Sequence, residues 1–169
     1  GHGTAPSGER SVARCESGGA AGLALVGEAP GAEEDKQGLP FVGRAGALLR
    51  SMLISIGLSR EDVYIANVLK CRPPSNRDPL GQEVRECSPF LHRQIDLVQP
   101  EIIVAMGRFA AQVLLDSNES LGQLRGRPHN FGETLIPLVV TYHPAYLLRS
   151  PTAKSNTWED LLLARSVLA

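Results

Sequence analysis

Short apolar runs alternate along the chain with longer segments whose apolar residues recur at helical spacing. The runs have strand length and predict four strands, at residues 23–26, 63–67, 102–105 and 137–142. After the first run, helical spacing links Leu48, Leu49, Met52, Leu53 and Ile56, and Gly57 follows as a helix stop. A second helix is predicted with one apolar face made of Val84, Cys87, Phe90, Leu91, Ile95 and Val98.

Two further helices are expected, near residues 108–115 and over residues 158–167. Strands that alternate with helices in this way are typical of a parallel sheet covered on both faces. We therefore predict a three-layer α/β/α sandwich with a central, mostly parallel four-stranded sheet. Residues 15–169 are expected to form a single domain, because 169 residues leave little room for a second core. Residues 1–14 are interpreted as a disordered tail or an expression remnant.

The segments that follow the predicted strands carry most of the unusual polar chemistry. They read GEAPGAEED, NVLKCRPPSNRDP, MGRFA and YHPAYLLRSP. Parallel α/β sheets bind ligands outside the carboxyl ends of their strands. These four segments are therefore expected to converge on one edge of the sheet.

Glu28, Asn67 and His143 are the candidate active-site residues at that edge. Individually, Asn67 fits a turn former, and His143 before a proline fits a structural histidine. The acids at 33–35 fit the negative first turn of a helix equally well. Together, however, an acid, an amide and an imidazole match a charge stabiliser, a two-way hydrogen-bonding group and a donor to an oxyanion.

Nucleic acid is the favoured ligand class, although the formal net charge of −1 predicts no general basic field. Asn67 offers both a donor and an acceptor to a base edge. Phe41 could stack on a base or equally be a core aromatic. A local basic rim for phosphates is predicted from Lys70, Arg72, Arg77, Arg125, Arg127 and Arg149. The stretch YLLR has the composition of a wedge that enters a base stack.

The motifs GEAPGAEED, GLPFVGRAG, NVLKCRPPSNRDP, QIDLVQPEIIVAMG, LRG and TYHPAYLLRSP occur in this order from Gly27 towards Trp158. In these motifs and in their order, the chain resembles the iron–sulfur (type 4) uracil-DNA glycosylases. The resemblance implies a monofunctional glycosylase of base excision repair. Such an enzyme hydrolyses the N-glycosidic bond of a flipped-out deoxyuridine in single- or double-stranded DNA, and leaves an abasic site.

The resemblance also assigns roles to individual residues. It implies that Glu28 acts near the reacting sugar and that His143 stabilises negative charge on the uracil. Ala29, Phe41 and Asn67 would form the uracil pocket. The segment 145–149 matches the loop that penetrates the duplex, so the expected DNA-binding residues are Lys70, Arg72, Arg125, Tyr146, Leu147, Leu148 and Arg149.

Three cysteines are present, and the family resemblance gives them a common role. It implies that Cys15, Cys71 and Cys87 bind a [4Fe–4S] cluster, which normally requires four thiolates. The fourth ligand is not visible. Either a stretch of the native chain before the first strand is missing from this sequence, which we favour, or a ligand has been lost.

Other function classes remain open at this stage. Glu28, Glu33, Asp35 and His143 could instead bind a divalent metal for phosphoester hydrolysis. A DNA- or nucleotide-binding module without glycosylase turnover is the non-enzymatic alternative. No apolar span of about 20 residues and no signal peptide are visible, so we expect no membrane partner, a monomer and a cytoplasmic, prokaryotic location close to the nucleoid.

Overall fold

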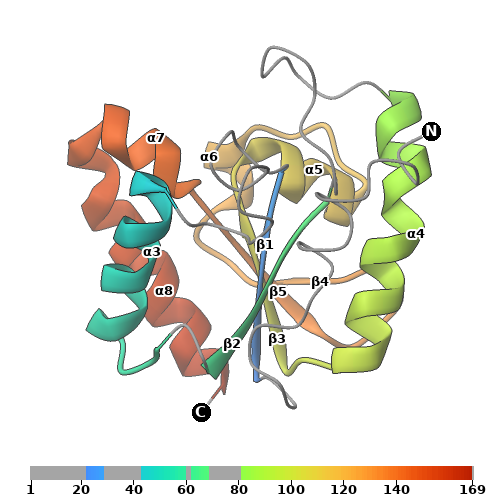
Figure 1. Cartoon of the computed structure of the whole chain (residues 1–169), viewed down its shortest axis with the longest axis horizontal. Helices are drawn as coiled ribbons and strands as arrows, with labels where there is room; N and C mark the ends of the chain where they lie inside the picture. The colour runs from blue at the N-terminus through green and yellow to red at the C-terminus, as the bar shows by residue number, and fades with distance from the viewer. Residues whose placement is uncertain (1–21, 29–42, 60–61, 69–80, 169) are drawn as a thin grey trace.

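The computed structural model describes residues 22–28, 43–59, 62–68 and 81–168, without the side chains of residues 81–88 (Figure 1). In chain order the elements are β1 (Leu23–Gly27), α3 (Arg44–Ser55), β2 (Val63–Asn67), α4 (Gly81–Val98), β3 (Ile102–Met106), α5 (Arg108–Leu115), α6 (Leu121–Leu124), β4 (His129–Asn130), β5 (Pro137–Thr141), α7 (Pro144–Arg149), the 3-10 turn η4 (Pro151–Ala153) and α8 (Lys154–Leu168).

The strands form one sheet in the order β2-β1-β3-β5-β4. The four predicted strands are all present and all parallel, which confirms the predicted α/β architecture. A fifth strand, β4, pairs antiparallel with β5 through only two residue pairs. The sequence did not predict β4, because two residues are too few to show any periodicity.

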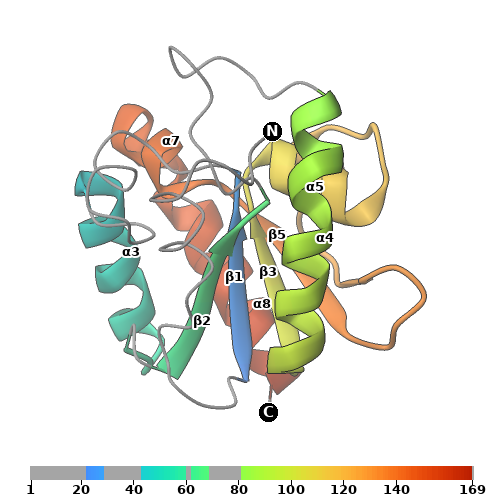
Figure 2. The ribbon, with the colours of Figure 1, turned by 45° about the vertical axis from the view of Figure 1, so that its right-hand side comes forward.

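Side chains on alternate residues of the strands enter two separate cores. Leu25, Ile65 and Val104 pack in the core beneath α3 and α8. Val26, Ala66 and Ala105 pack in the opposite core, beneath α4 and α5. Figures 1 and 2 show the corresponding layers, with α3, α7 and α8 on one side of the sheet and α4 on the other. Burial on both faces explains why each strand is an unbroken apolar run.

Two predictions about helices need correction. Residues 145–149 were expected to be a loop, but they belong to helix α7, which Pro144 begins at its first position. Phe90 was expected on the buried face of α4, but 39% of its surface is exposed, whereas Leu91 and Ile95 are buried as predicted. Proline at the start of a helix reads in sequence as a helix breaker, which hid α7.

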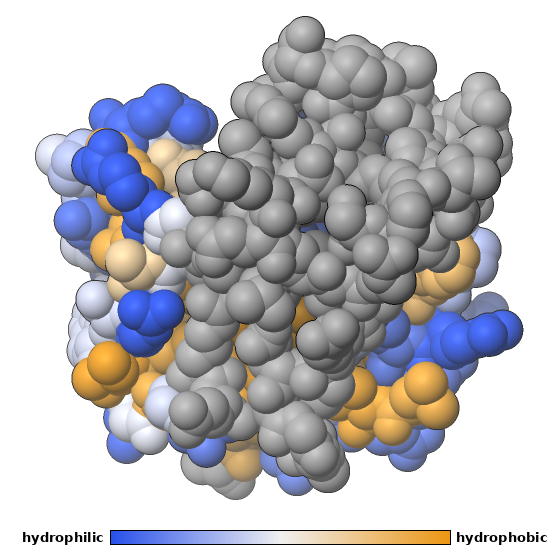
Figure 3. All heavy atoms as spheres, viewed as in Figure 1, coloured by the Kyte–Doolittle hydropathy of each residue, from blue (hydrophilic) through white to orange (hydrophobic). Residues whose placement is uncertain are grey.

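The surface combines charged and apolar residues. In Figure 3, apolar residues are scattered among hydrophilic ones over both helical layers of the visible face. Ile54 on α3 and Leu97 on α4 are strongly exposed. Within the described ranges, no helix has the length and apolar character needed to cross a membrane.

Candidate active site at the carboxyl edge of the sheet

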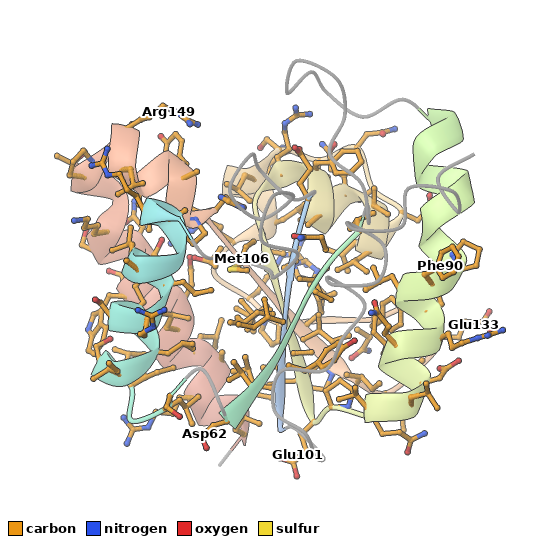
Figure 4. The ribbon with its side chains drawn as sticks, viewed as in Figure 1. Asp62, Phe90, Glu101, Met106, Glu133 and Arg149 are labelled. Atoms are coloured by element: carbon orange, nitrogen blue, oxygen red, sulfur yellow. The ribbon has the colours of Figure 1, made fainter. Side chains whose placement is uncertain are left out.

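The four parallel strands end at the same edge of the molecule. In Figure 4, Asp62 and Glu101, which precede β2 and β3, lie at the lower edge, and Arg149, which follows β5, lies at the top. The strand register pairs Gly27 with Asn67 and Met106 with Thr141 at the carboxyl ends. Glu28, Asn67 and His143 therefore lie at the ends of three strands of one sheet, as the sequence predicted.

Glu28 and Asn67 occupy neighbouring strand ends. Gly27 pairs with Asn67, and the amide of Val68 donates a hydrogen bond to the carbonyl oxygen of Gly27 over 2.9 Å. Asn67 is only 2% exposed, whereas Glu28, one residue beyond β1, is half-buried. Asn67 is thus buried at its strand end, and Glu28 follows the neighbouring strand end with partial access to solvent.

His143 is fixed at the N-terminus of α7. It is the N-cap residue, and its Nδ1 accepts a hydrogen bond of 3.0 Å from the backbone amide of Ala145. Nδ1 must therefore carry a lone pair rather than a proton. In the neutral imidazole the proton then resides on Nε2, which makes Nε2 a hydrogen-bond donor.

The turn from β3 into α5 is hydrogen-bonded to the strand that precedes His143. Gly107 adopts φ +98° and ψ +161°, a conformation that is essentially restricted to glycine. Its amide donates a 2.8 Å hydrogen bond to the carbonyl oxygen of Thr141 at the end of β5. This bond ties the end of β3 to the backbone two residues before His143.

Arg125 is placed differently from the expected phosphate contact. Its Nε and Nη2 donate to the two carboxylate oxygens of Asp160 over 2.8 and 2.9 Å. Nη2 also donates to the carbonyl oxygen of Asn156 over 3.0 Å. The side chain of Arg125 is only 16% exposed and that of Asp160 is 2% exposed. We therefore correct the expectation: the structure gives Arg125 an internal ion pair with α8 instead of a place on the basic rim.

The Arg125–Asp160 ion pair also contacts the segment that precedes His143. The hydroxyl of Thr141 donates a 2.7 Å hydrogen bond to Asp160 Oδ2. The Arg125 guanidinium carbon lies 5.2 Å from the centre of the Tyr142 ring, and this ring stacks on Tyr146 with 4.9 Å between centroids. Asp160, Arg125, Tyr142 and Tyr146 thus form a continuous chain of contacts from α8 to α7.

Burial governs the ionisation of Asp160. It raises the pKa of the Asp160 carboxyl above the ordinary value, although the hydrogen bonds from Arg125 and Thr141 oppose the rise. The hydrogen bond to Asp160 in turn raises the pKa of Arg125. Arg125 therefore stays charged at every physiological pH.

The residues expected to enter DNA have unequal exposures. Arg149 is exposed in the last turn of α7, Tyr146 is 37% exposed and Leu148 is half-buried. Leu147 is fully buried at 0% exposure. The expectation for Leu147 is therefore corrected, since its side chain belongs to the packing beneath α7 rather than to a DNA-contacting surface.

Several predicted site residues lie outside the described residues. These are Ala29, Phe41, Lys70, Arg72, Cys15 and Cys71, together with the acids at 33–35. Cys87 falls within α4, but its side chain is not described. Among the described residues no group of three or more His, Cys, Asp or Glu side chains could hold a metal ion.

Comparison with known proteins decides the family. The model of the Uracil DNA glycosylase superfamily matches residues 17–163. The type-4 uracil-DNA glycosylase of Archaeoglobus fulgidus is 45% identical over 145 residues, which cover 82% of this chain and 72% of that protein. The chain belongs to the type-4 uracil-DNA glycosylase family.

Two other type-4 uracil-DNA glycosylases support the same assignment. The protein of Thermotoga maritima is 46% identical over 86% of this chain and 77% of its own length. The protein of Pyrobaculum aerophilum is 43% identical over 84% of this chain and 76% of its own length. The match therefore extends over nearly all of the α/β domain.

Several residues that contact the segment before His143 could not be predicted from the sequence. Asp160 is one of two adjacent acids on α8, and its partner Arg125 is 35 residues away. From the sequence, Thr141 and Tyr142 were predicted only as the last two residues of a strand. Gly107 did give a signal, since a glycine directly after an apolar strand often marks a special backbone conformation.

Proposed function

We propose that this chain excises uracil from DNA with Glu28, Asn67 and His143 at the carboxyl edge of its sheet. The activity rests on family membership, which makes the chain a uracil-DNA glycosylase, a hydrolase that acts on N-glycosyl bonds in DNA repair. The observation that supports the assignment of residues is the convergence of three strand ends, with Gly27 paired to Asn67 and Met106 to Thr141.

Glu28 and His143 would act on opposite charges of the transition state. As the glycosidic bond breaks, uracil leaves as an anion and the sugar becomes cation-like. A half-buried carboxylate beside the sugar stabilises the cation or orients the attacking water. The Nε2 proton of His143, directed by the hydrogen bond at Nδ1, is suited to donate to a uracil oxygen. Both interactions strengthen as charge develops, so they accelerate the reaction.

Asn67 would read the polar edge of uracil, because its amide offers a donor and an acceptor from a buried strand end. Phe41 would stack on the base, and the backbone of Ala29 would complete the pocket. Extrusion of a base costs a few kcal/mol and is easiest for a mispaired base. The pocket would therefore select a nucleotide that has already left the duplex.

DNA would be held by exposed groups around this edge. We assign phosphate contacts to Lys70, Arg72 and Arg149, and contacts with the opened duplex to Tyr146 and Leu148. Arg149 and Tyr146 are exposed on α7, which His143 caps. Single-stranded and double-stranded DNA would both be substrates. A monomeric state and a cytoplasmic location remain predictions.

An iron–sulfur cluster belongs to the type-4 family by resemblance, and we propose Cys15, Cys71 and Cys87 as its ligands. Their thiolates have the right chemistry, but three are one short of the four that a [4Fe–4S] cluster normally takes. The donor set in this sequence is therefore incomplete. The cluster would serve the structure, and no step of uracil excision passes through it.

The proposal is tested with an oligonucleotide that contains one uracil. Incubation with the protein and then with alkali should cleave the strand at the uracil, while a matched thymine oligonucleotide stays intact. Addition of EDTA should leave the cleavage unchanged, which separates the glycosylase from a divalent-metal phosphoesterase. Binding of uracil-DNA without alkali-labile product would instead indicate a binding module without turnover.

A further inference from the structure

The chain of contacts from α8 to α7 joins residues that lie on both sides of His143 in the sequence. Asp160 lies in the middle of α8, is 2% exposed, and receives three hydrogen bonds, two from Arg125 and one from Thr141. A buried ion pair is weak evidence for stability, because its desolvation penalty can exceed the attraction between the charges. Another role therefore explains its presence better.

The contacts of this ion pair lead to the two residues that precede His143. Thr141 is bonded through its side chain to Asp160 and through its carbonyl oxygen to the amide of Gly107. The next residue, Tyr142, lies under the Arg125 guanidinium. Thr141 is thus held through its backbone and its side chain, and Tyr142 is held through its ring.

The same contacts reach the residues that follow His143. Tyr142 stacks on Tyr146 at an interplanar angle of 15°, and Tyr146 lies on α7, the helix that His143 caps. The imidazole is therefore held between two anchored points, one on each side in the chain. Both anchored points are connected to Asp160 through these contacts.

We infer that Asp160, acting through Arg125, Thr141 and Tyr142, is a positioning residue that holds His143 in the orientation needed for uracil excision. This inference rests on the proposed role of His143. A small displacement of a catalytic group can reduce a rate by about 100-fold. Loss of the Asp160 charge should therefore reduce the rate of the chemical step more than it reduces the affinity for DNA.

The test compares single-turnover excision and DNA affinity in four variants. Asp160→Asn removes the charge and keeps the size of the side chain. Arg125→Gln removes the other charge, and the double variant removes both. Ala164→Gly is the matched control, because it weakens α8 at a buried position that has no part in the network.

We expect Asp160→Asn and Arg125→Gln each to slow excision by about 10- to 100-fold while the Kd for uracil-DNA changes little. The double variant should be no slower than the slower single variant, since residues of one network are not additive. Ala164→Gly should lower the Tm without lowering the single-turnover rate of the folded protein. If Asp160→Asn does not fold, Tyr142→Leu tests the same path, because it leaves the ion pair intact and removes both ring contacts.

The inference is overturned if Asp160→Asn and Arg125→Gln excise uracil at the wild-type rate. It is also overturned if Ala164→Gly loses as much of its excision rate as they do when the Tm values are equal. His143→Ala is measured in parallel to separate the role of His143 in excision from the positioning role of Asp160. Absent excision by the wild type, or full excision by His143→Ala, would count against the proposed function. A slow His143→Ala variant beside a fast Asp160→Asn variant would count against the positioning role alone.

Discussion

Gly107 lies directly against His143: a Cβ atom built on Gly107 would be 3.4 Å from the Cβ of His143. Gly107 also has φ +98° and bonds to Thr141. The junction between β3 and α5 thus needs a glycine for its backbone conformation, and this glycine lies in van der Waals range of the segment that carries the imidazole.

We expect Gly107→Ala to lower both stability and excision. The strained backbone should lower the free energy of unfolding by about 1–3 kcal/mol, and relaxation of this turn would disturb its hydrogen bond to Thr141, two residues before His143. Gly122→Ala on α6 is the control, since nothing lies within 4 Å of its Cβ position. Thermal unfolding and single-turnover excision are measured for both. A Gly107→Ala variant that matches Gly122→Ala in both measurements would refute this constraint.

His143 combines a helix cap with the proposed donor, and two substitutions separate these roles. His143→Ala removes both, whereas His143→Ser restores a good N-cap side chain but cannot reach a uracil oxygen in the same way. Excision by both variants should fall by about 100- to 1,000-fold, as for the loss of an oxyanion donor. Only His143→Ala should also lose about 1 kcal/mol of stability. Wild-type excision by His143→Ser would show that the imidazole is dispensable.

Asn67→Asp should impair uracil recognition. An ionised carboxylate only accepts hydrogen bonds, so the donor that faces a uracil carbonyl would be lost. Because Asn67 is 2% exposed, the variant must be compared at a temperature well below its own Tm. Excision of uracil with unchanged kcat/KM would contradict the proposed role.

Arg149→Ala should weaken DNA binding and reduce its salt dependence. Loss of one phosphate contact changes the slope of log K against log salt by about 0.9 for duplex DNA. Arg165→Ala is the matched control, because Arg165 is exposed in the last turn of α8, at the opposite edge of the sheet (Figure 1). Binding is measured by fluorescence anisotropy over a salt series. Equal slopes for the two variants would remove Arg149 from the DNA-contacting surface.

Asp160 should make stability depend on pH in an unusual direction. A carboxyl whose pKa is raised by folding contributes stability below its unfolded value, about 3.9, and loses it as pH rises through the folded value. The free energy of unfolding of the wild type, minus that of Asp160→Asn, should therefore decrease as the pH rises from about 3.9 through the raised pKa. An increase over this range would mean that the ion pair with Arg125 outweighs burial.

The sequence predicted the sheet because burial on both faces makes each strand a continuous apolar run. It also placed Glu28, Asn67 and His143 at one edge, since parallel strands bring their carboxyl ends together. It missed α7, where Pro144 begins the helix instead of breaking it. It misjudged Arg125, because an exposed basic residue and one paired with a buried acid look alike in sequence.

His143 and Glu28 are proposed to take part in cleavage of the glycosidic bond of deoxyuridine. The most direct measurement is chromatographic detection of free uracil released from uracil-DNA under single-turnover conditions, by the wild type, Glu28→Gln and His143→Ser. The wild type should release one uracil for each abasic site formed, and both variants should release it far more slowly at similar DNA occupancy. Equal release by all three proteins would contradict the proposed roles of Glu28 and His143.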